Sequence, residues 1–127
     1  MKYLPLVGRI LFSLIFIMSG LAHIMGQGVE VIGSLPMPGV AIVIGGLLSF
    51  AGGLSVALGY KSNIGTLLII VFLLATMFTV HNFWTMSDPM TQQIQMAMFM
   101  KNLALIGAAI LIHINGTGDM SLDNRTA

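Results

Sequence analysis

The chain has 127 residues, of which 57% are hydrophobic and only 7% are charged. Because soluble domains carry about 25% charged residues, five basic and four acidic side chains cannot cover a soluble globule of this size. Disordered chains are excluded as well, since they are poor in apolar residues. The scattered Lys and Arg form no surface for nucleic acid, and the absence of Cys excludes disulfide exchange and thiolate catalysis. We therefore expect an integral membrane protein whose surroundings are the lipid bilayer.

Four apolar stretches are long enough to cross a bilayer, whose core of about 30 Å needs roughly 20 helical residues. They cover residues 4–25, 40–58, 64–80 and 96–114. The links between them are short and contain helix-breaking residues such as Pro36, Gly59 and Pro89. Short links make consecutive helices antiparallel neighbours. The sequence therefore predicts an all-α, up-down-up-down four-helix bundle that forms a single transmembrane domain, residues 1–127.

The orientation follows from the basic residues, because Lys and Arg accumulate on the cytoplasmic side of membrane proteins. Those of the termini and of the second link would share one side of the membrane: Lys2, Arg9, Lys61 and Arg125. The first and third links carry Glu30 and Asp88 instead. We therefore predict cytoplasmic termini and a multi-pass protein of the bacterial inner membrane. A cleaved signal peptide is the alternative for the first span, because Gly20 and Ala22 are small, but Arg9 lies too deep in the apolar stretch for that pattern.

The first span carries a stripe of polar and small residues. At about 100° per residue, five positions fall within roughly 40° of one line along the helix: Arg9, Ser13, Phe16, Gly20 and His23. Such a stripe is expected to face other helices rather than lipid. For Arg9 the favoured interpretation is a side chain that reaches the cytoplasmic head groups. For His23, an interfacial position and a functional one both stay open.

The second span carries small residues at four-residue spacing: Gly45, Ser49, Gly53 and Ala57. Small residues at this spacing allow two helix backbones to approach closely. We predict helix packing along this ridge, either inside one bundle or across a homodimer. The Ser49 hydroxyl is expected to bond a carbonyl one turn back in its own helix.

Polar and aromatic side chains gather where the first, third and fourth spans meet the outer membrane face. On the antiparallel layout, the ends of these spans bring five residues to one level: His23, His81, Trp84, Lys101 and Asn102. Convergent polar groups above an apolar body are typical of a ligand pocket. Alternatively, Trp84 is an interfacial anchor. The partner of Lys101 is expected to be Glu30, Asp88 or a bound anionic or carbonyl ligand.

Other kinds of site find little support. Only His23 and His81 lie close enough to share an ion, with no carboxylate near them in sequence, so no metal site is predicted. No nucleophile elbow and no phosphate-binding Gly loop are present. Catalytic residues therefore stay unknown. A proton-coupled exporter is the least favoured class, because such coupling needs an acid within the spans and none is found there.

Short fragments follow one another in a fixed order along nearly the whole chain. They are Gly8-Arg9-Ile10-Leu11 with Phe16, Ser19-Gly20-Leu21-Ala22-His23-Ile24, Leu35-Pro36-Met37-Pro38, Gly52-Gly53-Leu54, Leu58-Gly59-Tyr60, His81-Asn82-Phe83-Trp84, Phe99-Met100-Lys101-Asn102-Leu103-Ala104-Leu105-Ile106-Gly107, Gly116-Thr117-Gly118 and Ser121-Leu122-Asp123. In this order and spacing they resemble the DoxX family of small bacterial membrane proteins. The sequence departs from that family at Ser49, where many members have Glu. It also departs from many members at His23, where they have Lys, although others share the His.

The resemblance implies four transmembrane helices and redox chemistry, since some DoxX relatives are subunits of thiosulfate:quinone oxidoreductase. It implies quinone as a cofactor and a redox protein as a partner, while no haem, flavin or metal signature is present. We expect His23 and His81 to hydrogen-bond carbonyl oxygens, Lys101 to stabilise an anion and Trp84 to stack on the ring. The alternative is a non-catalytic membrane scaffold or assembly factor, in which the same residues tie the helices together.

Overall fold

The computed structural model describes residues 3–33, 35–118 and 120–123, and all regular elements in this part of the chain are helical. The four long helices are α1 (Leu4–Ile24), α2 (Pro38–Leu58), α3 (Ser62–Thr79) and α4 (Pro89–Asn115). Two short 3-10 helices lie in the links, η1 (Val29–Ile32) and η2 (Phe83–Thr85). The predicted all-α class is confirmed. Lys2 and Arg125, used to predict the orientation, lie outside the described residues.

The helix boundaries follow from capping and from breaker residues. α2 ends at Gly59, whose φ of 66° lies in the left-handed region and whose N–H bonds Val56 O at 3.1 Å. α4 begins at Pro89, ahead of the expected residue 96, because the carboxylate of Asp88 accepts a hydrogen bond from Thr91 N at 3.0 Å. The predicted span 96–114 starts too late, because the polar residues Gln92, Gln93 and Gln95 belong to this helix as well.

All four helices are long and apolar enough to cross a membrane. At 1.5 Å per residue, the 27 residues of α4 extend for about 40 Å, which exceeds a hydrocarbon core of about 30 Å. The surplus length accommodates the polar first turns of α4, which carry Gln92 and Gln93 on exposed positions.

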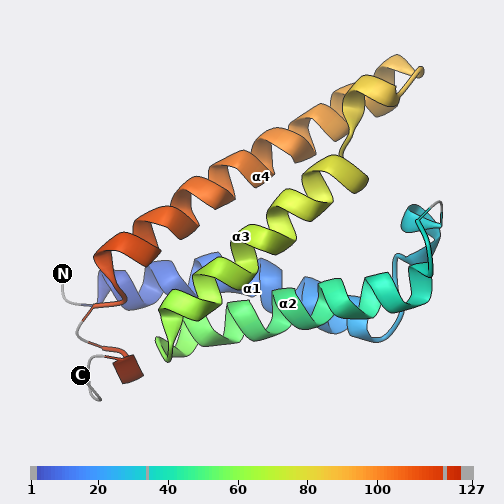
Figure 1. Ribbon diagram of the computed structural model, residues 1–127. Coiled ribbons are helices and arrows are strands. Elements are labelled where there is room, and N and C mark those ends of the chain that lie inside the picture. The colour runs from blue at the N-terminus through green and yellow to red at the C-terminus, as the bar shows by residue number, and fades with distance from the viewer. Residues whose placement is uncertain (1–2, 34, 119, 124–127) are drawn as a thin grey trace.

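The helices pack in the order of the chain: α1 against α2, α2 against α3 and α3 against α4. Figure 1 shows α1 and α2 running side by side, with α3 and α4 diverging from them toward the ends that carry η1 and η2. The start of α1, the end of α4 and the α2–α3 turn lie together at the opposite end. We call the end with η1 and η2 the outer end and the other the inner end, following the predicted orientation.

Glycines allow the closest helix approaches. A Cβ on Gly46 would lie only 2.8 Å from Gly20 O, and one on Gly52 only 2.9 Å from Gly65 O, so the α1–α2 and α2–α3 contacts are backbone on backbone. These two crossings were not among the residues that we had singled out for packing.

The predicted ridge of small residues on α2 contacts two different helices, α1 and α3. The side of Gly53 faces Phe16 of α1, where an added Cβ would lie 2.9 Å from Phe16 Cβ, whereas Gly45 faces the ring of Phe72 on α3. Ser49 is fully buried and its hydroxyl donates to Phe16 O at 2.8 Å. The expectation of a bond to its own helix is wrong, because α1 passes close enough to offer its carbonyl instead.

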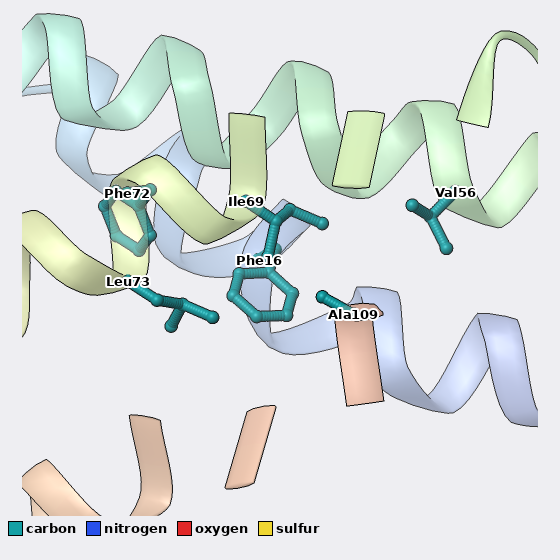
Figure 2. Packing of buried hydrophobic residues seen from close by; sticks show 6 residues of the cluster. All are labelled: Phe16, Val56, Ile69, Phe72, Leu73 and Ala109. Carbon is teal, nitrogen blue, oxygen red and sulfur yellow. The ribbon is translucent and has the colours of Figure 1, made fainter. Parts of the chain in front are cut away.

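The stripe on α1 faces the other helices. The buried residues of α1 are Arg9, Ser13, Phe16 and Gly20, and His23 is half-buried. Phe16 lies in the centre of the hydrophobic core with Val56, Ile69, Phe72, Leu73 and Ala109, as Figure 2 shows. This core joins all four helices and lies on the inner side of the cavity described below.

Arg9 does not extend to the head groups as we expected, since only 3% of it is exposed. Its Nη2 donates to Met120 O at 2.5 Å, in the segment that follows α4. The same segment places the carboxylate of Asp123 on the start of α3, where it accepts hydrogen bonds from Lys61 N at 2.6 Å and Ser62 N at 3.0 Å. The described residues after α4, 116–118 and 120–123, thus fold back over the inner end and cover the guanidinium.

Candidate ligand-binding pocket

A cavity of about 550 Å³ lies between the four helices and the first link, on the outer side of the core. This volume falls in the range of about 300–1,000 Å³ that is usual for small-molecule sites. Its wall is mainly apolar, with Phe16, Ile42, Leu48, Phe72, Leu73 and Leu105. Its polar side chains are Ser19, His23, Thr76, Thr79, His81, Lys101 and Asn102. An apolar body with a few polar groups suits a lipophilic ligand with a polar head.

The pocket brings together four of the five side chains that we had predicted to converge: His23, His81, Lys101 and Asn102. His23 lies on α1, His81 lies just after α3, and Lys101 and Asn102 lie on α4. The antiparallel topology brings these segments together at one end of the molecule. Trp84 is not part of the described wall. Each of the five has different surroundings, which decide what it offers to a ligand.

His23 lies one residue before the end of α1, where its ring is 6.3 Å from the ring of Phe72. Its Nδ1 is buried and has no hydrogen-bond partner. A buried N–H without a partner costs more than a buried acceptor without one. In the neutral ring the proton is therefore favoured on Nε2, the edge near Gly28, which also lines the cavity. His23 thus offers a donor.

His81 follows α3, and its ring is fixed by α4. Its backbone N–H bonds Thr76 O at 3.0 Å, and its Nδ1 lies 2.7 Å from Gln95 Oε1. Because a carbonyl oxygen only accepts hydrogen bonds, Nδ1 is the donor in this pair. In the neutral ring Nε2 is then an acceptor, ready for a hydroxyl of a ligand.

Asn102 is part of the helix packing rather than free for a ligand. It is 2% exposed, and its Nδ2 donates to Thr76 Oγ1 at 2.8 Å and to Leu73 O at 3.3 Å. These bonds join α4 to α3 at the wall of the cavity. The amide therefore gives the pocket its shape, and only its remaining surface faces a ligand.

Lys101 precedes Asn102 but lies on the rim. It lines the cavity and is exposed at the same time. Of the two expected acidic partners, Asp88 is held at the start of α4 by Thr91, and the side chain of Glu30 lies outside the described part of the structure. No acidic side chain belongs to the described wall of the pocket. Lys101 is thus the one charged group that this wall offers.

Trp84 lies away from the cavity because η2 turns it back over α3 and α4. It is 52% exposed, and its ring packs edge-on against Phe99 at 5.7 Å and Phe83 at 5.3 Å, with Phe78 at 6.1 Å. An aromatic cluster at the outer end of membrane-spanning helices is typical of an interfacial anchor. Stacking on a ligand inside the pocket would require a different position of this ring.

Sequence reasoning missed three contributors to the pocket. Gln95 orients His81, and it lies just before the predicted span 96–114. Thr76 binds Asn102. The sequence feature that indicates Thr76 is its position one turn before Thr79, on the same face of an apolar helix. The first link contributes Gly28 and Ile32, whose irregular backbone follows no periodic pattern. Within the described residues, no group of three His, Cys, Asp or Glu could hold a metal ion.

A family model described as the SURF4 family matches residues 1–127. The chain is similar to inner membrane protein YphA of Escherichia coli (strain K12), with 33% identity over 126 residues that cover 96% of this chain and 89% of YphA. It is also similar to inner membrane protein YqjF of the same organism, with 33% identity over 123 residues that cover 93% of this chain and 88% of YqjF. No solved structure matches the chain.

These matches overturn the DoxX resemblance. The fragments on which it depended are short runs of Gly, aromatic and polar residues at helix ends, which helix packing and membrane interfaces favour in many four-helix membrane proteins. They indicated the four-helix membrane fold but did not identify the family. The inner-membrane relatives, together with four membrane-crossing helices, place this multi-pass protein in the inner membrane, surrounded by lipid. The chain belongs to the SURF4 family.

Proposed function

We propose that this membrane protein binds a lipophilic molecule with an oxygen-bearing head in the pocket at its outer end. The observation that carries the proposal is the apolar cavity of about 550 Å³ into which His23, His81 and Lys101 converge. The same cavity is large enough for a ring with a short chain, so a quinone is a suitable first ligand to test.

The polar groups favour a particular kind of head. His23 Nε2–H and the ammonium of Lys101 are donors, which suit carbonyl, carboxylate or phosphate oxygens. His81 offers an acceptor, because its Nδ1–H is used by Gln95. A redox role would also need an electron donor from outside the chain, since Cys is absent and no metal-binding group is described. Ligand binding therefore comes first in the proposal, and a redox-linked role would depend on it.

A direct test is the affinity of the purified protein for ubiquinone-1, measured by equilibrium dialysis in detergent. Loss of one hydrogen bond to a charged donor is worth about tenfold in affinity. We expect Lys101→Gln to weaken binding by that factor, and His23→Ala, which removes the neutral Nε2–H donor, to weaken it by about fivefold. Lys61→Gln is the matched control, because Lys61 is exposed in the α2–α3 turn at the inner end. Unchanged affinity in both pocket variants would refute the assignment of these side chains.

A membrane scaffold is the second candidate, because two polar contacts join α4 to the end of α3. They are Asn102 to Thr76 at 2.8 Å and His81 to Gln95 at 2.7 Å. On this account the polar groups stabilise helix packing and the cavity holds only bulk lipid chains. The two functions differ in a thermal-shift measurement. Ligands raise the melting temperature if the pocket is a site, whereas no lipophilic ligand shifts it if the protein is a scaffold.

A further inference from the structure

We propose that the pocket is entered sideways from the bilayer, between α1 and α4, and that its occupant is an acidic lipid whose negative head is bound by Lys101. This inference depends on the proposed ligand-binding function and names the class of ligand. It rests on three observations: how the helices pack, where the charges lie, and which way the polar end of the cavity points.

The first observation is that α1 and α4 are not packed closely along their backbones. The helices pack in chain order, and α1 and α4 make almost no close backbone contact with each other. Yet both line the cavity, α1 through Ile15 and Ser19 and α4 through Lys101 and Leu105. Figure 1 shows that α4 diverges from the α1–α2 pair toward the outer end. The side chains of α1 and α4 meet in the core at Phe16 and Ala109. We therefore place the entrance from the lipid, the mouth of the pocket, on the outer side of that contact, where the two helices diverge.

The second observation is the charge at this mouth. Lys101 is exposed and belongs to the wall, which places its side chain on the rim. The described wall contains no other Lys or Arg and no acidic side chain. Asp123 is engaged at the inner end by Lys61 N and Ser62, far along the helices. An ammonium at membrane depth is costly without a counter-charge, so a ligand that carries a negative group binds with an advantage over a neutral one.

The third observation is the direction of the cavity. Side chains of a helix tilt toward its N-terminus, so the stem of Lys101 leans toward the outer start of α4. His81 and Gln95 lie in that direction, whereas the apolar wall continues inward past Leu73 to Phe16. A lipid of the outer leaflet has the same polarity, with its head at the surface and its acyl chain toward the middle of the bilayer. Phosphatidylcholine would bring a cation of its own to Lys101, whereas an acidic phospholipid brings none.

The test uses the full chain, purified in detergent and equilibrated with equal amounts of dioleoyl phosphatidylglycerol and dioleoyl phosphatidylcholine. Native mass spectrometry then counts the retained lipids of each class. Because the two lipids share their acyl chains, a difference in retention reports the head group alone. We expect about a tenfold preference for phosphatidylglycerol, the value of one charge-assisted contact. Lys101→Gln should bring the preference close to one, and Lys61→Gln should leave it unchanged.

A third variant separates this inference from the function on which it rests. Gly45 lines the pocket, and a Cβ there would lie at an ordinary 3.7 Å from Phe72 Cε1, so Gly45→Leu should fill the cavity without disturbing the backbone. It should abolish retention of both lipids. If it does so while the wild type retains both lipids equally, the charge inference is wrong and the pocket stands. If it retains lipid as the wild type does, both proposals are wrong.

Discussion

At the scale of single residues, two consecutive residues of α4 differ in their burial and in their contacts. Lys101 is exposed on the rim of the cavity, whereas Asn102 is 2% exposed and bonds Thr76 and Leu73 of α3. Successive residues of a helix point about 100° apart, so one residue faces the packed helix while the other faces the mouth. One residue of this polar pair thus joins two helices, while the other is available for the proposed ligand.

Replacement of Asn102 tests this division. Asn102→Ala removes two interhelical hydrogen bonds and should lower the free energy of unfolding by about 1–2 kcal/mol, the usual range for such bonds in membranes. The measurement is the unfolding midpoint in a titration with sodium dodecyl sulfate. Gln93→Ala is the control, because Gln93 is exposed on the same helix. Equal midpoints for the two variants would show that the Asn102 bonds do not stabilise the α3–α4 pair.

At the scale of helices, glycine spacing on α2 sets the distances to both neighbours. Gly46 meets Gly20 of α1 and Gly52 meets Gly65 of α3, in both cases at backbone contact. Gly45 differs, since its surroundings leave room for a methyl group beside Phe72. Adjacent glycines therefore serve unlike purposes, one at a helix crossing and one in the wall of a cavity.

The two glycines give a matched pair of variants. A Cβ at position 46 would lie 2.8 Å from Gly20 O and 2.9 Å from His23 Cβ, so Gly46→Ala must push α1 away. We expect a loss of about 1–3 kcal/mol in the free energy of unfolding, as is usual for overpacking. Gly45→Ala should not lower it, because the added methyl group has room and Ala favours a helix more than Gly does. Differential scanning calorimetry checks both, and equal destabilisation by the two variants would refute the assigned crossing.

At the scale of the whole molecule, the two ends are built differently. At the inner end, residues 120–123 cover Arg9 and place Asp123 on the start of α3. Burial raises the pKa of Asp123, but hydrogen bonds from Ser62 and from Lys61 N, with the cation of Arg9 nearby, leave that pKa below its ordinary value of 3.8. The outer end, in contrast, opens around the cavity.

The lowered pKa of Asp123 predicts a pH dependence. The ionised carboxylate is favoured by the fold, so its stabilisation is complete above the ordinary value of 3.8 and is lost as the pH falls through the lower pKa of the folded state. Asp123→Asn should therefore lower the free energy of unfolding by about 1 kcal/mol at pH 7, as for loss of a helix cap. The difference from the wild type should shrink on acidification below that value. A constant difference down to pH 2 would contradict this role.

The sequence predicts the fold well because hydropathy alone determines membrane-crossing helices, and short links determine their antiparallel order. The same topology indicates which side chains meet at the outer end. Three features escape this reasoning because they depend on contacts between distant segments. Arg9 is covered by Met120, Ser49 bonds a carbonyl of α1, and Trp84 turns away with η2. The predicted start of the fourth span, residue 96, is too late. The Gln residues before it are polar and give no apolar signal, although they belong to the helix that Asp88 caps.

The central claim is that the cavity is a binding site for a lipophilic molecule, and filling it is the most direct test. Gly45→Leu places a side chain in the pocket, whereas Gly107→Leu places the same side chain on an exposed position of α4, where an added Cβ has no neighbour within 4 Å. The measurement is the affinity of both variants for ubiquinone-1 in equilibrium dialysis. We predict that Gly45→Leu weakens binding by about 100-fold, equivalent to about 2.7 kcal/mol, and that Gly107→Leu binds as the wild type does. Equal affinities in the two variants would contradict the account.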